Sequence, residues 1–189
     1  YVGDNGAAKG YRFIQEHLYT KSKGKNIVVF ADDYIMPTEW FDKMVENMDN
    51  HPEFSFMVPS TSFVCQEQLT EDIEIDYHPD WDVRVAPKGD HKKWGYKTIY
   101  GGVTVDHIND LYKKHAHLPV IQFWGAPSFE TTIFNREYMD EIGLIHERYY
   151  SQWYDNDYFM LGFNKGKIGG IAKNAFIFHY GKGGTKALY

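Results

Sequence analysis

The sequence predicts an α/β fold in which a mostly parallel sheet is flanked by helices. Short apolar runs alternate with helical patterns along the 189 residues, as in layered α/β proteins. The run at 26–31, NIVVFA, is β-branched and aromatic without polar alternation, which is typical of a strand buried on both faces of a mainly parallel sheet. A chain of this length is sufficient for one domain with its own core. We therefore expect a single Rossmann-like domain.

The first third of the chain predicts two helices and two strands. Residues 6–19 carry apolar side chains at helical spacing and end in the polar segment 21–24. A second helix is expected after Pro37, with Thr38 as its N-cap and an apolar stripe formed by Trp40, Phe41, Met44, Val45 and Met48. The strands are expected at 26–31 and 54–59.

The middle of the chain, residues 60–102, predicts an insertion or a flexible flap because its mixed charges show no sustained periodicity. Three helices are expected after it, at 106–115 with Asp106 as cap, at 136–142 between Asn135 as N-cap and Gly143 as C-cap, and at about 155–164. The remaining strands are expected at 120–124, 130–134, 167–172 and 175–179.

Composition and charge narrow the class of protein. The net charge is −6, with acidic and basic residues mixed along the chain, so no basic stripe is available to bind nucleic acid. The single cysteine, Cys65, excludes an internal disulfide and a thiolate metal site within the chain, and no apolar run approaches the length of a membrane span. These features predict a cytoplasmic protein without a transmembrane segment. Aromatic residues make up 17% of the chain, which fits either an aromatic core or stacking on carbohydrate rings.

The strongest local signal for chemistry is Asp32-Asp33, directly after the strand at 26–31. Ligands of open α/β sheets bind beyond the carboxyl ends of the strands, and a divalent cation such as Mg²⁺ would relieve the repulsion between adjacent carboxylates. The competing interpretation is structural: one acid forms a turn and the other caps the next segment. The dipeptide alone leaves both interpretations open.

Two further positions are candidates. Asp155 and Asp157 lie at the start of a helical pattern and follow several aromatic rings, so one of them fits an N-cap, while an acid partly desolvated by rings would suit a general base. His179 ends an apolar strand and precedes a glycine-rich segment. It fits either a hydrogen-bonded polar residue or an imidazole ligand for a metal already held by carboxylates.

The order of these motifs resembles the family 2 glycosyltransferases with the GT-A fold, which are inverting enzymes that use nucleotide diphosphate sugars. The resemblance is carried by NIVVFADDYIMPTEWFDKMVENMDNHPEFSFMVPS, by GAPSFETTIFNREYMDEIG and by YYSQWYDNDYFMLGFNKG with the later Phe178-His179. Residues 1–16, and Asp4-Asn5-Gly6 especially, resemble the stretch just before the strand that carries the metal motif. These segments cover about two thirds of the chain. The resemblance implies a GT-A-like, mostly parallel sheet that binds a nucleotide sugar.

The resemblance also implies a role for each candidate. Asp33 matches the carboxylate that contacts Mn²⁺ or Mg²⁺, Asp32 its partner on the metal or the nucleotide ribose, and Asp155 the catalytic base. His179 matches a histidine that helps to hold the metal or the diphosphate. The chain departs from the family pattern at Ala31, where an acid or amide is usual, and at Tyr154, where Glu is usual. The first strands of that fold, which grip the nucleotide base, have no counterpart ahead of Tyr1. Either these strands are absent, which would weaken nucleotide binding, or the chain is a fragment of a longer domain.

The expected function is therefore transfer of a sugar from a nucleotide diphosphate sugar to a carbohydrate or glycoconjugate acceptor. A nucleotidyltransferase of related α/β fold would also use paired acids and a metal, but no Gly-rich loop ending in Lys or Arg follows an early strand. A carbohydrate-binding module without catalysis is the alternative from another class, and it is favoured by the aromatic content and by Ala31.

Overall fold

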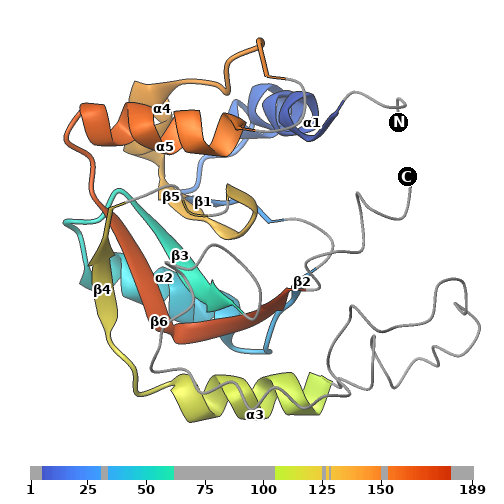
Figure 1. The fold of residues 1–189 in the computed structure, drawn as a ribbon, viewed down its shortest axis with the longest axis vertical. Helices are drawn as coiled ribbons and strands as arrows, with labels where there is room; N and C mark the ends of the chain where they lie inside the picture. Colours follow the sequence, from blue (N-terminus) through green and yellow to red (C-terminus); the bar gives the residue numbers. More distant parts are fainter. Residues whose placement is uncertain are drawn as a thin grey trace, which may run out of the picture.

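The computed structural model describes residues 6–30, 34–61, 105–124, 127, 129–149 and 153–179. Within these ranges helices and strands alternate as expected, and the fold is mixed α/β (Figure 1). The helices are α1 (Gly6–Ile14), α2 (Trp40–Asn50), α3 (Val105–His115), α4 (Arg136–Ile142) and α5 (Tyr154–Asn164), with a π-helical turn η1 (Gln15–Tyr19) and a 3₁₀ turn η5 (Phe129–Thr131). The strands are β1 (Asn26–Val28), β2 (Tyr34–Ile35), β3 (Phe56–Thr61), β4 (Val120–Phe123), β5 (Ile133–Asn135) and β6 (Gly169–His179).

The strands form a sheet of order β1-β5-β3-β6-β2, with β4 also paired to β6. Of the described pairings only β3 with β6 is parallel, whereas β1–β5, β3–β5, β2–β6 and β4–β6 are antiparallel. The described strands therefore differ from the mostly parallel sheet that we predicted. The apolar run at 26–31 indicated burial, but burial does not determine the direction of the neighbouring strand, and β5 runs opposite to both β1 and β3.

Helices cover the two faces of the sheet. On one face α1, α4 and α5 pack over a cluster of aromatic side chains, and on the other α2 packs through Trp40, Met44 and Met48 (Figure 1). Six rings of the first cluster, called here the aromatic core, are those of Phe56, Phe129, Phe134, Tyr138, Tyr158 and Phe159. Its rings are in contact, with centroids 4.8 Å apart for Phe56 and Phe159. Packing of the core thus accounts for much of the aromatic content.

Strand β6 is longer than predicted because a polar residue within it is satisfied by a buried partner. We expected two strands interrupted at Lys173-Asn174, but β6 continues through them, with a register shift against β3 between Pro59 and Ser60. Asn174 is buried and exchanges amide hydrogen bonds of 2.7 and 3.2 Å with Asn47 of α2. Because the buried amides bond each other, the polar residue does not end the strand.

The helix boundaries agree with the local signals except at α2 and α3. Asp106, the predicted cap of the helix at 106–115, lies inside the first turn of α3, which begins at Val105. Asn135 caps α4, because its Oδ1 accepts a 2.8 Å hydrogen bond from the Tyr138 N–H, and Gly143 follows the helix at φ 85°. The predicted N-cap Thr38 is wrong, since the cap of α2 is Glu39, which makes no side-chain capping bond. Of the predicted insertion, Ser60 and Thr61 belong to β3, and the rest lies outside the described residues.

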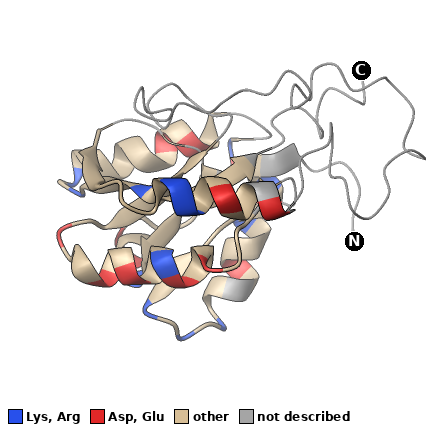
Figure 2. Cartoon of the chain, turned by 90° about the horizontal axis from the view of Figure 1, so that it is seen from below, with Lys and Arg blue, Asp and Glu red and all other residues tan. Residues whose placement is uncertain are grey.

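Acidic and basic positions are interspersed along the helices seen in Figure 2. Among the helices in the described ranges, none combines the length and the apolar character needed to cross a bilayer.

Candidate active site

The predicted site residues differ in what the structure describes of them. Asp32 and Asp33 lie outside the described residues, between the end of β1 and the start of β2. His179 is the last residue of β6, and its backbone is described but its side chain is not. Asp155 lies in the first turn of α5 and is described in full.

The register between β2 and β6 relates His179 to the acidic pair. His179 is paired with Tyr34, the residue that directly follows Asp33 in the sequence, and Phe178 is paired with Ile35. These two segments are separated by more than a hundred residues along the chain, so their pairing could not be read from local sequence patterns. The register leaves His179 opposite the residue next to Asp33.

The first turn of α5, the end of β1 and the end of β6 all lie on the same side of the molecule, at the right in Figure 1. Of the candidates on this side, Asp155 can be examined atom by atom.

Helix α5 begins in an unusual conformation. Its N-cap residue is Trp153, which lies in the left-handed region at φ 68° and makes no side-chain capping bond. It is the one non-glycine residue with positive φ in the described part of the chain. The left-handed conformation is unfavourable for a residue with a Cβ atom, and such strain is concentrated at functional sites. The indole is 69% exposed, so packing against the protein does not explain it.

The two acids in this turn have different environments. Asp157 is paired with Arg148, whose Nη2 donates a 3.1 Å hydrogen bond to its Oδ1. Asp155 has no cation partner among the described side chains, and its Oδ1 accepts a 2.9 Å bond from the backbone N–H of the next residue, Asn156. Neither acid is the N-cap residue, which is Trp153, so that assignment is wrong, but the Asp155 carboxylate does bond backbone N–H groups of the first turn.

Burial determines the acidity of Asp155. Desolvation of the half-buried carboxyl raises the pKa of Asp155 above its ordinary value, and bonds from the backbone N–H groups of Asn156 and of Asp155 itself oppose that effect. A carboxylate whose pKa is raised holds a proton more firmly. It is therefore a better general base near neutral pH than an ordinary surface aspartate.

Hydrogen bonds hold the loop between α4 and α5 in place. Arg148 also donates a 2.6 Å bond to the Tyr149 hydroxyl, and its guanidinium lies over that ring. Further back, Arg12 Nη1 donates to the Ile145 carbonyl at 2.6 Å, and the Ile145 N–H donates to Gln15 Oε1 at 2.7 Å. These contacts connect α1 through the loop to the first turn of α5.

The inner face of α5 is fixed by the aromatic core. The Tyr138 hydroxyl donates to the Tyr158 carbonyl at 3.0 Å, and the Tyr158 hydroxyl donates to the Gly143 carbonyl at 2.9 Å. Burial raises the pKa of both phenols, so they remain neutral donors at any working pH. The helix that bears Asp155 is therefore held in position by ring contacts and hydrogen bonds on its buried face.

Sequence reasoning missed three features of this region. The left-handed Trp153 had no signal, because glycine is the usual residue in that conformation. The Arg148–Asp157 pair spans nine residues without a regular helical spacing. The register between β2 and β6 is non-local. By contrast, the start of α5 next to two acids was correctly predicted.

Among the described residues, no group of three His, Asp, Glu or Cys side chains is placed to hold an ion. The predicted ligands Asp32, Asp33 and the side chain of His179 are outside that set.

Comparisons with protein-family models, with curated proteins and with solved structures found no match to this chain.

Proposed function

We propose that this chain is an inverting glycosyltransferase that moves a sugar from a nucleotide diphosphate sugar to a hydroxyl of a carbohydrate or glycoconjugate acceptor. The observation that carries the proposal is the environment of Asp155: a half-buried carboxylate without a cation partner among the described side chains, with a raised pKa, beside an exposed indole. Its neighbour Asp157 supplies the contrast, because Arg148 compensates its charge.

In the proposed reaction the acceptor oxygen attacks the anomeric carbon of the donor sugar. The bond from that carbon to the diphosphate oxygen breaks, and the proton of the acceptor hydroxyl passes to a carboxylate oxygen of Asp155. The configuration at the anomeric carbon is inverted because attack and departure occur on opposite faces. Asp155 is the base, and Trp153 presents a flat apolar face on which an acceptor sugar can stack.

The proposal includes a divalent cation, Mn²⁺ or Mg²⁺. The donor set of Asp33 and His179, with Asp32 on the metal or on the nucleotide ribose, suits either ion, since carboxylates are preferred ligands and imidazole accepts Mn²⁺. The pairing of His179 with Tyr34, next to Asp33, supports this set. The cation, when bound, supplies positive charge for the departing diphosphate.

The finer fold assignment is also a proposal. We infer a GT-A-like nucleotide-sugar-binding arrangement from the order of strand, acidic pair, helix and strand at the start of the chain and from α5 with β6 at its end. Among the described strand pairs, the parallel pair β3 with β6 supports this assignment, whereas the other four pairs are antiparallel.

The test is release of nucleoside diphosphate from a panel of nucleotide sugars, each with and without an acceptor sugar and with and without Mn²⁺. We expect release for one donor class, dependent on both the metal and the acceptor. Binding of sugars without turnover of any donor would instead favour a carbohydrate-binding module, for which the exposed indoles of Trp124 and Trp153 are the favouring observation.

A further inference from the structure

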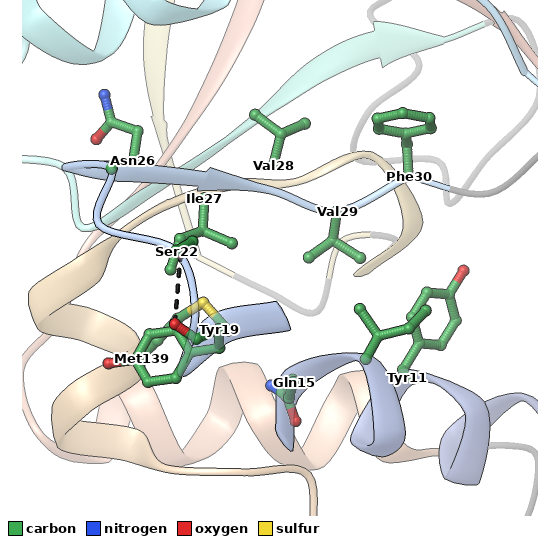
Figure 3. Close-up of a pocket in the computed structure, with 12 residues that line it drawn as sticks. Tyr11, Gln15, Tyr19, Ser22, Asn26, Ile27, Val28, Val29, Phe30 and Met139 are labelled. Carbon is green, nitrogen blue, oxygen red and sulfur yellow. Dashed lines mark hydrogen bonds between the residues drawn. The ribbon is translucent and has the colours of Figure 1, made fainter. Parts of the chain in front are cut away.

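Several buried polar atoms of the described residues lack a hydrogen-bond partner. Three of them lie along the apolar cleft of about 410 Å³ between β1 and the α1–η1 segment, on Gln15, Tyr19 and Asn26 (Figure 3). Amides do not ionise near neutral pH, and a phenol ionises only at about pH 10. Within the described part of the chain, one such atom belongs to a group that changes charge between about pH 5 and 8, and it is Nδ1 of His115.

His115 is buried in the contact between α3 and β6. It lies in the last turn of α3, is 3% exposed, and packs against the ring of Phe176 with centroids 5.6 Å apart. Ile108, Leu111 and Tyr112 are buried on the same helix. Their spacing places them and His115 on one face, with which α3 packs on β6 (Figure 1). The histidine therefore occupies a position at which an apolar side chain would be usual.

The charged groups around this ring are basic. Those that act on His115 from its own helix and the following turn are Lys114 and His117. The ionisable residues of β6, against which the ring packs, are Lys173 and His179. A proton on His115 would therefore add charge where the described neighbours already carry positive or potentially positive groups.

The described acids near α3 lie elsewhere on the helix. Three acids of α2 and the residue before it act on Tyr112, one turn earlier, and these are Glu39, Asp42 and Glu46. The acids of α3 itself, Asp106 and Asp110, are at exposed positions. In the described structure, none of these carboxylates acts on the buried imidazole.

The neutral form of His115 is the one that fits the packed helix. Desolvation lowers the pKa of His115 below its ordinary value, and the charges of Lys114 and His117 act in the same direction. The Leu111 carbonyl opposes this effect, although it makes no hydrogen bond of good geometry with Nδ1. An imidazolium at this position would lack both water and a counter-charge, which is unfavourable.

We propose that α3 is an acid-released helix, which packs on β6 while His115 is neutral and separates from β6 when the ring takes up a proton. Separation returns the imidazolium to water. The released helix binds one proton more than the packed helix between the lowered and the ordinary pKa. The equilibrium constant for release should therefore increase by up to about tenfold for each pH unit of acidification in that interval.

The fold allows α3 to leave without opening the sheet. Strand β6 is held by pairing with β2, β3 and β4, none of which involves α3. Two described hydrogen bonds join α3 to the segment at the start of α2, from the Thr38 N–H to Asn109 Oδ1 at 3.2 Å and from the Tyr112 hydroxyl to the Glu39 carbonyl at 3.5 Å. Both are long, so they oppose separation only weakly.

The first experiment follows ring titration and amide exchange by NMR in the 189-residue protein. We expect the His115 ring to titrate below the ordinary value of 6.5. Opening constants for the amides of Ile108, Leu111 and Tyr112, corrected for intrinsic exchange, should rise toward tenfold per pH unit of acidification. Amides of α5 should keep their protection over the same range. Opening of α3 that is independent of pH, or that always equals the opening of α5, would overturn the proposal.

Matched histidine variants assign the effect to one ring. His115→Gln keeps a polar side chain and His115→Leu fills the position with an apolar one, but neither ionises. Both should remove the pH dependence of α3 opening. His117→Gln, at an exposed histidine two residues along, should retain the dependence of the parent. A tenfold slope that persists in His115→Gln would overturn the role of this ring.

An apolar fluorescent dye provides a second readout of release. Separation would expose Phe176 and the apolar face of α3, so dye fluorescence of the parent should increase over the pH interval in which α3 opens. His115→Leu should show no increase in that interval. An equal increase in parent and variant would show that acid acts on another part of the fold.

Discussion

Helices α4 and α5 pack side by side on the aromatic core but begin in opposite ways. Asn135 starts α4 in an extended conformation with a capping hydrogen bond to Tyr138, and Gly143 ends it. Trp153 starts α5 in a left-handed conformation without a capping bond, exposes its indole, and is followed by two acids. The first helix follows the rules that favour stability, while the second departs from them where we propose the chemistry. Such departures are expected at functional sites.

The largest effect that tests this contrast is on turnover. Asp155→Asn should lower sugar transfer by about 10²–10⁴-fold, because a positioned base contributes roughly that factor and Asn cannot accept the proton. Donor affinity and melting temperature should remain near those of the parent. Steady-state kinetics, donor titration and thermal unfolding measure the three quantities.

Asp157→Asn is the matched control two residues along. It removes the exposed ion pair with Arg148, which is expected to contribute little to stability. Transfer by this variant should stay close to that of the parent. If Asp155→Asn transfers sugar at a similar rate to Asp157→Asn, the base is elsewhere.

The next largest expected effect is a loss of stability when the N-cap of α4 is removed. Asn135→Ala removes the bond to the Tyr138 N–H and should lower the free energy of unfolding by about 1 kcal/mol. Activity per folded molecule should not change, because α4 carries no proposed catalytic group. Asn135→Asp, which keeps a capping oxygen, should restore most of the loss in urea unfolding. A loss of transfer in folded Asn135→Ala would erase the distinction between the two helices.

The sequence predicted the local features of both helices and not their surroundings. Asn135 and Gly143 could be read as caps because capping depends on residues within one turn. The environment of Asp155 could not be read, since its burial and the pairing of Asp157 with Arg148 arise only when the loop before α5 folds back. Thr38 failed as a cap because α2 begins at Trp40, so that Glu39 occupies the N-cap position.

Strand pairing was the least predictable part of the fold. The apolar run at 26–31 was correctly assigned as a strand, but β1 is shorter and lies at an edge of the described sheet. Lys173-Asn174 predicted a break, yet Asn47 satisfies Asn174 from a distance of 127 residues along the chain. Such partners lie far apart in the sequence, so local periodicity cannot predict that they pair.

A smaller effect is expected at Trp153. Trp153→Gly should raise the free energy of unfolding by up to about 1 kcal/mol, because glycine adopts the left-handed conformation without the steric cost of a Cβ atom. If the indole stacks on the acceptor, the same change should raise the acceptor KM. A gain in stability together with a loss of acceptor affinity is expected only if the residue is retained for function.

Trp153→Ala separates the two contributions. It removes the ring but keeps the Cβ atom, so the acceptor KM should rise without the gain in stability. Unchanged acceptor kinetics in both variants would show that the exposed indole has no part in binding.

The smallest effect is a pair of opposite pH trends caused by one carboxyl. Burial raises the pKa of Asp155 in the folded protein, so between its ordinary and its raised pKa the folded state binds more protons than the unfolded state. The contribution of Asp155 to stability is therefore fully present below the ordinary pKa and is lost as pH rises through the raised value. Transfer must rise over the same interval, because only the ionised carboxylate is a base. Urea unfolding and kcat/KM measured across this range should show stability falling while activity rises. Asp155→Asn should remove both trends, and a parent whose activity is flat through the interval would separate catalysis from Asp155.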